Sequence, residues 1–343
     1  MGRRRQRIIA WLGDLQGLLR CFWNYAVRKR TQVTSAPLEV SLEVTNVCNY
    51  RCAFCPQSDR AHLETVGRHY LTPEKAGIIL DGFRRLGYTR SMLHWTLDGE
   101  PFMNKRFAEL SALAADHGYQ NQYFASNLHL LTVERARTLS RSVRYEFNVD
   151  FCADKTYFEE VRGTRGAWET VRVNITGILA DRELEHLSFV VADISSFGID
   201  DPKALRENMR RLRAVFPRSD RIRFAEKTFH NATGTVDLQR SGGRSRRYHL
   251  CPYPWTSLSI AASGDVVPCC RELTHKTVLG NALETPLAEI WNGEPFIRFR
   301  ENLVRQRPEL NAACRDCDMP WDGSKFSAGN LLRTLRNRLQ VGK

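Results

Sequence analysis

The sequence predicts an α/β protein in which parallel strands alternate with helices to form an α/β barrel or part of one. From Leu38 onward, six short runs rich in β-branched and aromatic residues alternate with helical stretches. The 343 residues are 42% hydrophobic and 26% charged, which allows a sizeable buried core. This composition excludes disorder, collagen and a multi-span membrane protein as descriptions of the whole chain.

The strands are expected at residues 38–45, 91–97, 121–126, 145–151, 187–193 and 221–226. The first helix is expected to begin at Pro73, with Thr72 as its N-cap. Further helices are expected at residues 105–117, 132–140, 166–182 and 201–215. Because such units form a parallel sheet with right-handed crossovers, reactive side chains should gather at the carboxyl ends of the strands.

Composition changes along the chain divide it into four predicted parts. Residues 241–247 concentrate Gly, Ser and Arg without an apolar period, and residues 250–321 hold five of the ten cysteines and one helical pattern, at 286–303. We therefore predict an N-terminal helix at 1–36, a barrel at 37–240, a cysteine-rich domain at 241–321 and a C-terminal helix at 322–343.

The net charge of +13 is concentrated near the N-terminus, where eight basic residues and one acidic residue occur within positions 1–30. An apolar stripe runs through this segment, and a similar basic, leucine-rich pattern closes the chain. Both helices are expected either to dock on the main domain or to contact an anionic membrane surface. Neither spanning of a membrane nor a cleaved export signal is expected. No groove-reading motif predicts specific nucleic-acid binding.

Three cysteines follow the first predicted strand as Cys48-x3-Cys52-x2-Cys55. Without an export signal, clustered thiols are better explained as metal ligands than as disulfides. Structural zinc prefers four ligands, and the next candidates along the chain are His62 and His69. Three thiolates in one loop can instead hold three irons of a [4Fe-4S] cluster and leave the fourth iron open.

This cysteine pattern resembles the motif of the radical S-adenosylmethionine (radical SAM) superfamily. The resemblance extends over residues 38–321 and implies a partial (β/α)6 barrel of the TIM type. It also implies that SAM binds the open iron of a [4Fe-4S] cluster held by Cys48, Cys52 and Cys55. One electron then cleaves SAM to a 5′-deoxyadenosyl radical, which takes a hydrogen atom from the substrate.

Further short motifs of the same family follow in order. Residues 97–101 resemble G-G-E-P with Asp98 at the first glycine, and the pair Ser126-Asn127 precedes Leu128 where glycine is usual. Residues 148–150 resemble S-x-D, and Arg162-Gly163 resembles the end of I-R-G. The resemblance implies that SAM is bound by Phe54, Gly99, Glu100, Ser126, Asn127, Asp150 and Arg162.

A second set of cysteines comprises Cys251, Cys269, Cys314 and Cys317. Together with residues 251–255, 264–269, 279–281 and 290–291, it resembles the SPASM/twitch extension of radical SAM enzymes. Four spaced cysteines imply the shorter twitch form with one auxiliary [4Fe-4S] cluster. Cys269 is preferred over Cys270 because it completes the G-x-V-x-P-C pattern. A structural zinc ion remains an alternative.

An auxiliary cluster can accept an electron from a substrate radical, so we expect dehydrogenation of a sugar- or cyclitol-like substrate. The alternatives are epimerisation of such a substrate, with Cys152 as a conceivable hydrogen-atom donor, and maturation of a ribosomal peptide. Asp193, Glu226 and His230 are conceivable general bases, but the sequence assigns the role to none of them.

The expected partners are a small-molecule or glycan substrate and an electron donor such as flavodoxin or ferredoxin. The expected location is the cytoplasm, with membrane-surface contact through the terminal helices as a further possibility. A zinc-stabilised basic binding protein without catalytic activity is the alternative from another class.

Overall fold

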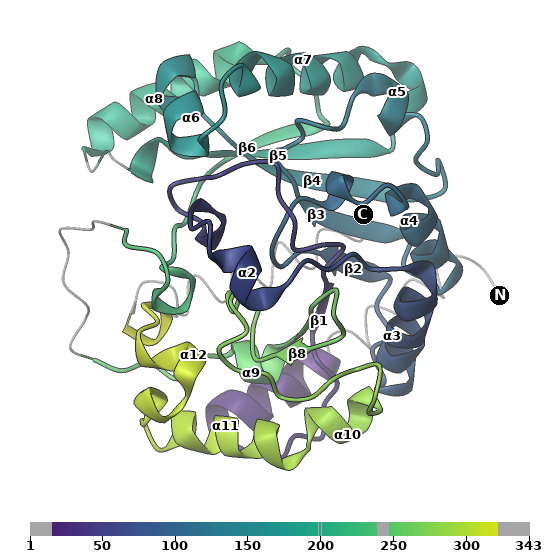
Figure 1. Cartoon of the computed structure of the whole chain (residues 1–343), viewed down its shortest axis with the longest axis vertical. Coiled ribbons are helices and arrows are strands. Elements are labelled where there is room, and N and C mark those ends of the chain that lie inside the picture. The colour runs from purple at the N-terminus through teal and green to yellow at the C-terminus, as the bar shows by residue number, and fades with distance from the viewer. Residues whose placement is uncertain (1–15, 198, 200, 239–246, 322–343) are drawn as a thin grey trace.

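The computed structural model describes residues 16–197, 199, 201–238 and 247–321. Their strands form one eight-stranded sheet in the order β6-β5-β4-β3-β2-β1-β7-β8 (Figure 1). All neighbouring strands are parallel except β7 and β8, and β6 pairs only with β5 among the described strands, so the barrel is partial. The strands are β1 Glu39–Leu42, β2 Met92–Trp95, β3 Asn121–Ala125, β4 Arg144–Phe151, β5 Leu187–Asp193, β6 Ile222–Glu226, β7 Ser257–Ile260 and β8 Val266–Val267.

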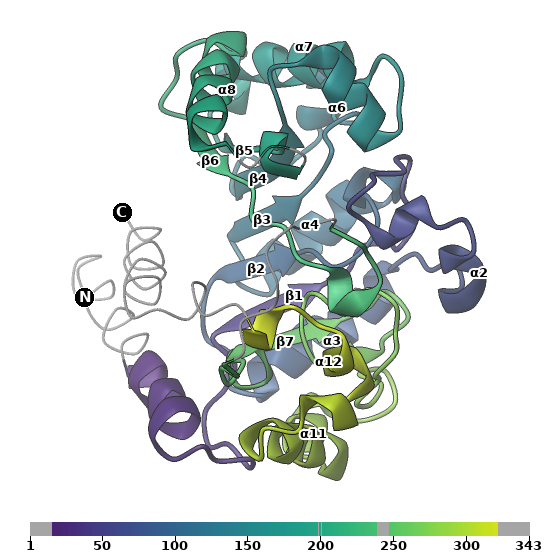
Figure 2. The same cartoon turned by 90° about the vertical axis from the view of Figure 1, so that its left-hand side faces the viewer.

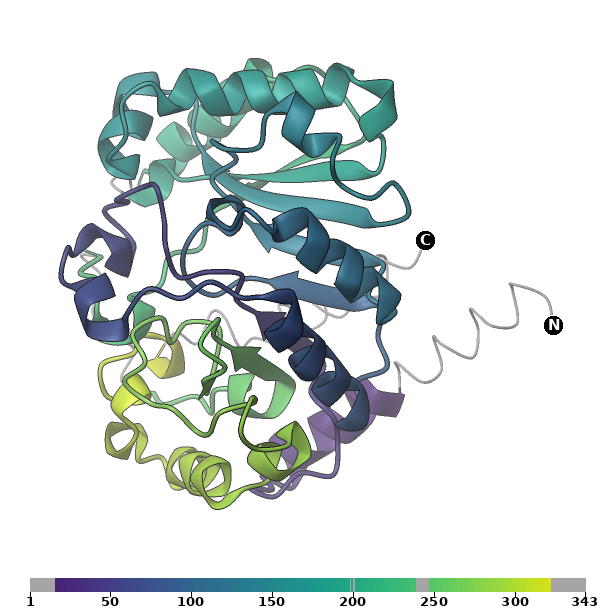
Figure 3. The same ribbon diagram turned by 45° about the vertical axis from the view of Figure 1, so that its right-hand side comes forward.

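Helices connect the parallel strands, and most of them cover the outer side of the curved sheet (Figure 3). They are α2 His62–Val66, α3 Pro73–Arg85, α4 Phe107–Asp116, α5 Val133–Ala136, α6 Lys155–Arg162, α7 Ala167–Ala180 and α8 Pro202–Val215. The cysteine-rich part contains α9 Tyr253–Thr256, α10 Leu287–Trp291, α11 Glu294–Val304 and α12 Ala312–Arg315. The α/β fold predicted from the sequence is therefore confirmed.

The six predicted barrel strands are all present, and the predicted cap of α3 is confirmed, because the Thr72 side chain accepts a hydrogen bond from the Lys75 amide at 3.4 Å. The helical pattern predicted at 286–303 is present as two helices. That segment forms α10 and α11, separated at Asn292 and Gly293. Pro295 lies in the first turn of α11, where it lacks an amide donor and prevents a continuous helix.

Aromatic rings form much of the core beneath the helices. The rings of Phe124 and Phe147, on neighbouring strands β3 and β4, stack with centroids 5.1 Å apart, and Phe189 of β5 continues the row. These three side chains are fully buried. Such cross-strand stacking fixes the register of the strands, since a slip by one residue would move the rings to the opposite face.

The cysteine-rich part is joined to the barrel through the sheet and through the N-terminal segment. Strand β7 pairs with β1 over four residues. The buried Arg300 of α11 donates hydrogen bonds to the carbonyls of Thr31, Trp291 and Pro254 at 2.8–3.0 Å. The extended residues before β1 are therefore held against α10 and α11.

Several predictions concern residues outside the described part of the chain. These are most of the N-terminal helix, at 1–15, the whole of the C-terminal helix, at 322–343, and the predicted boundary at 241–246. The four predicted domain limits remain predictions. Within the described residues, no helix combines the length and apolar character needed to cross a membrane.

An ion pair closes the turn between β7 and β8. His275 Nδ1 lies 3.3 Å from Asp265 Oδ2, and both side chains are largely buried. The hydrogen bond between them lowers the pKa of Asp265 to about 2 and raises the pKa of His275. The pair therefore stabilises the turn most when the imidazole is protonated and the carboxyl group is ionised.

We predict that H275N lowers the free energy of unfolding by about 1 kcal/mol near pH 6 and by less at pH 8.5. Because folding raises the pKa of His275, its contribution is complete below its unfolded pKa of about 6.5 and is lost as the pH rises through the folded value. Asparagine tolerates the positive φ of this position, 54°. Denaturant unfolding at both pH values tests this, and equal losses would contradict it.

Candidate active site and auxiliary metal centre

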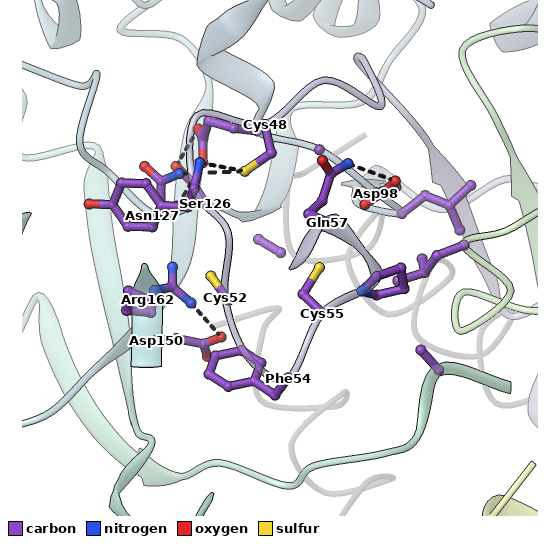
Figure 4. Close-up of a pocket in the computed structure, with 18 of the residues that line it drawn as sticks. Cys48, Cys52, Phe54, Cys55, Gln57, Asp98, Ser126, Asn127, Asp150 and Arg162 are labelled. Carbon is purple, nitrogen blue, oxygen red and sulfur yellow. Dashed lines mark hydrogen bonds and ion pairs between the residues drawn. The ribbon is translucent and has the colours of Figure 1, made fainter. Parts of the chain in front are cut away.

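The three thiols that follow β1 line one cavity of about 190 Å³ at the carboxyl edge of the sheet (Figure 4). The loop that carries them is fixed by its neighbour α6, because the Ala53 amide donates to the Val161 carbonyl at 2.8 Å. A side chain at Gly163 would place its Cβ 2.6 Å from the Arg51 carbonyl oxygen. Glycine after α6 therefore allows the close approach that holds the cysteine loop in place.

The segment after β2 brings Gly99 and Glu100 to the same cavity. Gly99 has a φ of +70°, and a Cβ there would lie 2.1 Å from the Thr45 carbonyl oxygen. The buried Glu100 accepts hydrogen bonds from the Ser126 hydroxyl at 2.8 Å and the Asn127 amide at 2.7 Å. Burial raises the pKa of Glu100, and these donors oppose that shift. Glu100 therefore ties the ends of β2 and β3 together.

The polar pair after β3 faces the cysteine loop. Asn127 Nδ2 donates to Asn49 Oδ1 at 2.8 Å and lies 4.0 Å from Cys48 Sγ. Leu128, which stands where the family usually has glycine, adopts a φ of 56°. The Ser126 hydroxyl accepts a hydrogen bond from the Leu128 amide at 3.0 Å and helps to hold this uncommon conformation.

Asp150 at the end of β4 is held between two cations. Lys227 Nζ lies 2.8 and 2.9 Å from its two oxygens, and Arg162 Nη1 lies 3.4 Å away. The Arg162 guanidinium also sits 5.6 Å from the Phe54 ring centroid. Burial lowers the pKa of Arg162, but the charges of Cys52 and Asp150 outweigh burial and raise it. The sequence analysis did not single out Lys227. Its position directly after β6, at the carboxyl end of a parallel strand, could have indicated it.

Phe54 lies within an aromatic wall of the cavity. Its ring centroid is 5.1 Å from that of Phe229 and 5.5 Å from that of Phe197, both in edge-on contact. Figure 4 shows Phe54 beside Asp150 and below the cysteine thiols. A flat apolar surface of this kind suits a nucleobase.

Asp98, which replaces the first family glycine, is a buried hydrogen-bond acceptor. Gln57 Nε2 donates to Asp98 Oδ2 at 3.0 Å, and His62 Nε2 lies 2.6 Å from the same oxygen. The Asp98 amide donates to Glu43 Oε1, while Glu43 Oε2 accepts from the Ala262 amide. Burial, then the charge of Asp98, raises the pKa of Glu43. This network joins the cysteine loop, β1 and the turn after β7.

The candidate general bases differ in position. Asp193 is buried and accepts hydrogen bonds from the Ser195 amide and hydroxyl, and Glu226 is exposed. Neither lines the cavity, whereas His230 does. His230 Nδ1 accepts the Ala232 amide at 3.1 Å, so its neutral form carries the proton on Nε2. The geometry therefore assigns the base to none of the three.

The chemistry of the cavity fits the predicted cluster and SAM. Burial raises the pKa of Cys48 to about 12 and also raises the pKa values of Cys52 and Cys55. Buried thiols of this kind become ligands when a metal stabilises the thiolate. Arg162 Nε is buried without a hydrogen-bond partner in the described part of the chain, which suits a site for an anionic group such as a carboxylate. The cavity is lined by all ten residues predicted for the cluster and SAM, namely Cys48, Cys52, Phe54, Cys55, Gly99, Glu100, Ser126, Asn127, Asp150 and Arg162.

A second cavity brings together the four predicted auxiliary ligands, which are Cys251, Cys269, Cys314 and Cys317. Burial raises the pKa of Cys251 to about 12 and raises those of Cys269 and Cys314 well above the usual value. Cys270 is absent from the lining, in agreement with the preference for Cys269. Among the described residues, no three His, Cys, Asp or Glu side chains lie close enough to share one metal ion.

The other two cysteines lie outside both cavities. Cys152 is fully buried, and its thiol points to the Asp154 carbonyl at 3.3 Å. Cys21 is buried against the Trp255 carbonyl. Cys152 therefore does not face the cavity in which it would donate a hydrogen atom to a substrate.

Comparison with known proteins identifies the class. A model described as the radical SAM superfamily matches residues 42–182, and the SPASM model, described as an iron-sulfur cluster-binding domain, matches residues 251–318. The chain therefore belongs to the radical SAM superfamily and carries a SPASM domain. It is an enzyme of that superfamily, whose cofactors are iron-sulfur clusters and SAM.

Two curated relatives cover most of the chain. The PqqA peptide cyclase of Xanthomonas euvesicatoria pv. vesicatoria (strain 85-10) is 23% identical over 332 residues, which are 86% of this chain and 85% of that protein. The S-adenosyl-L-methionine-dependent 2-deoxy-scyllo-inosamine dehydrogenase of Niallia circulans is 21% identical over 285 residues, or 81% and 92% of the two chains. One relative is named for peptide cyclisation and the other for dehydrogenation.

Two solved structures share the fold. BtrN in complex with AdoMet and 2-DOIA matches with a TM-score of 0.56 and 18% identity, over 82% of this chain and 92% of BtrN. Streptococcus suis SuiB bound to the precursor peptide SuiA matches with a TM-score of 0.53 and 18% identity, over 86% and 72% of the two chains.

We predict that G99A weakens SAM binding by at least about tenfold. The added Cβ meets the backbone of Thr45 and Asn46 at a positive φ, and strain of this kind costs about 1–3 kcal/mol. G77A is the matched control, because a Cβ at Gly77 meets nothing within 4 Å. Equilibrium dialysis of SAM against anaerobically reconstituted protein measures the difference. Equal affinities for G99A and G77A would contradict the close approach at Gly99.

Proposed function

We propose that this enzyme oxidises a sugar- or cyclitol-like substrate by two electrons and that an auxiliary [4Fe-4S] cluster accepts one of them. The proposal assigns Cys48, Cys52 and Cys55 to the SAM-binding cluster and the four cysteines of the second cavity to the auxiliary cluster. The dehydrogenase among the relatives and the BtrN fold support this choice.

The observation that best supports the proposal is that few residues separate the two cavities. Cys269 and Arg271 line the second cavity, whereas Leu273, two residues further on, lines the first. A second connection runs through Asn231, whose Nδ2 donates to the Asp316 carbonyl at 2.7 Å and whose Oδ1 accepts the Asp318 amide at 3.1 Å. A substrate in the first cavity would thus be separated from the auxiliary ligands by a few packed residues.

The proposed reaction balances in atoms and electrons. SAM and a reduced cluster, when bound, supply the hydrogen-abstracting 5′-deoxyadenosyl radical. The carbinol carbon loses one hydrogen atom, the hydroxyl group loses a proton to a base or water, and the remaining electron passes to the auxiliary cluster. The products are a carbonyl compound, 5′-deoxyadenosine and methionine. The initial electron would come from a reductant such as flavodoxin or ferredoxin.

The chain's own residues would bind and orient these groups. Phe54 offers a flat apolar surface for the adenine, and Arg162 offers a buried donor for a carboxylate. Glu100 and Asn127 hold the strand ends around the cluster loop. Asp150 keeps Arg162 and Lys227 in place through its two ion pairs.

Peptide modification is the second candidate, because the PqqA peptide cyclases are also relatives and the SuiB structure holds a precursor peptide. Epimerisation has less support, because Cys152 does not line the cavity. Product mass separates these reactions. Dehydrogenation removes two hydrogen atoms from the substrate, whereas epimerisation in deuterated solvent adds one deuterium at the reacting carbon.

We predict that C52A abolishes 5′-deoxyadenosine formation, whereas C314A retains SAM cleavage but stops net oxidation. C270A is the matched control, because Cys270 lies beside Cys269 and outside the lining of the cavity. C270A should retain about eight irons per chain, and C314A about four. Iron analysis, deoxyadenosine yield and product mass of candidate cyclitols are measured under anaerobic conditions. Normal oxidation by C314A would contradict the electron-acceptor role.

A further inference from the structure

A half-buried arginine faces the cavity of the auxiliary ligands. Arg271 lines that cavity together with Cys251, Cys269, Cys314 and Cys317. Its Nη2 donates to the Tyr253 hydroxyl at 3.3 Å, and its guanidinium carbon lies 5.6 Å from the Tyr253 ring centroid. Tyr253 thus holds one edge of the guanidinium plane and fixes its orientation.

Two further donors of the guanidinium are without a partner among the described residues. Arg271 Nε and Nη1 are both buried and have no hydrogen-bond acceptor in the part of the chain that the structure describes. Buried charged donors are costly unless they are paired. Next along the chain, Glu272 does not line this cavity, and its Oε1 accepts hydrogen bonds from Thr274 and from the Lys276 amide. A cluster bound by the four thiols, which share this lining with Arg271, would supply the missing acceptors.

We propose that Arg271 donates hydrogen bonds from Nε and Nη1 to the sulfur atoms of the auxiliary cluster and raises its reduction potential. The inference rests on the proposed auxiliary cluster. A cation and N–H···S hydrogen bonds stabilise the more negative, reduced form of an iron-sulfur cluster. Arg271 thereby makes this cluster a better acceptor for the substrate's electron.

The charges around the first cavity differ from this arrangement. Its two cations, Arg162 and Lys227, are both paired with Asp150, and Glu100 lies buried in the same lining. Carboxylates and paired cations do little to stabilise the more negative, reduced form of a cluster, so they favour a low reduction potential. A low reduction potential suits a cluster that reduces SAM. The first cavity is therefore charge-compensated, whereas the second contains an arginine with two donors that are unpaired among the described residues.

The test is a potentiometric titration of anaerobically reconstituted protein, followed by electron paramagnetic resonance of both clusters. In R271Q, the midpoint potential of the auxiliary cluster should fall, while that of the SAM-binding cluster stays unchanged. R271K retains the positive charge but lacks the planar guanidinium group and its N–H donors. The fall in the midpoint potential of the auxiliary cluster should therefore be smaller in R271K than in R271Q. R298Q is the matched control, because Arg298 is exposed on α11 and pairs only with Glu294 in the described contacts.

The outcomes distinguish this inference from the proposed function. Full iron content with an unchanged auxiliary midpoint in R271Q and R271K would overturn the role of Arg271 alone. Absence of an auxiliary cluster signal in the unsubstituted protein would overturn the proposed function as well. If R271Q fails to assemble the cluster, R271K supplies the comparison.

A separate observation concerns the outer face of the N-terminal segment (Figure 2). Residues 16–22 are α-helical, and a π-helix continues over Trp23–Val27. The inner side is docked, because Cys21 and Asn24 are buried and Asn24 donates to the Ser35 hydroxyl at 3.2 Å. The segment therefore uses part of its apolar surface for packing on the main fold.

The outer side remains exposed and combines apolar with basic residues. We define the outer patch as Leu19, Phe22, Trp23 and Val27, which are 46–60% exposed, together with Arg20, Arg28, Lys29 and Arg30. The Arg28 guanidinium carbon lies 5.4 Å from the Trp23 ring centroid. Aromatic and aliphatic side chains bordered by cations are typical of a helix that lies in the interface of an anionic membrane.

We infer that the outer patch binds an anionic lipid surface. Charge complementarity favours this occupant, because the outer patch carries four cations and no acidic residue. Each cation near such a surface contributes about 1 kcal/mol, or about fivefold in binding. The patch would thereby place the enzyme beside a membrane.

Sedimentation of the full chain with vesicles tests the patch. The protein should bind vesicles that contain phosphatidylglycerol and not vesicles of phosphatidylcholine alone. F22S/W23S and R28Q/K29Q should each lower binding at least about fivefold. The controls I78S/V173S and R211Q/R213Q remove equally exposed residues from α3, α7 and α8 and should bind normally. The inference would be overturned if the control variants lost as much vesicle binding as the patch variants. It would also be overturned if the unsubstituted chain did not bind the vesicles.

Discussion

The candidate site depends on the common direction of β1 to β6. Because these strands are parallel and adjacent, the segments that follow them reach the same edge of the sheet. Residues separated by more than a hundred positions, such as Cys48 and Lys227, therefore line one cavity. The aromatic row of Phe124, Phe147 and Phe189 holds that register from within the core. A change in register would separate the acidic side chains from the cations and thiols that they face.

A second constraint joins the two cysteine-lined cavities. Strand β7 extends the sheet beside β1, and Glu43 at the end of β1 accepts amides from both Asp98 and Ala262. The cysteine-rich part is thus built onto the same sheet that carries the cysteine loop. The proposed electron transfer between the cavities would benefit from such a rigid connection, because the intervening distance would stay constant.

Local sequence patterns predicted a large part of this arrangement. Strand periodicity was enough to locate the six barrel strands, and the family resemblance of the spaced motifs indicated ten of the residues that line the cavity. The pairing of β7 with β1 was not predictable in this way, since it joins segments more than two hundred residues apart. The ion pair of Lys227 with Asp150 also depends on the register across β4, β5 and β6. The sequence also did not single out Arg271. Two of its donors are buried without a hydrogen-bond acceptor in the described part of the chain, and only the folded structure shows this.

Hyperfine spectroscopy of the reduced SAM-binding cluster tests the central claim most directly. The claim is that Cys48, Cys52 and Cys55 leave one iron open and that SAM occupies it. With SAM labelled with nitrogen-15 at its amino group, electron-nuclear double resonance should detect coupling of the label to the cluster. A fully assembled and reduced cluster that shows no coupling in the presence of saturating SAM would contradict the account.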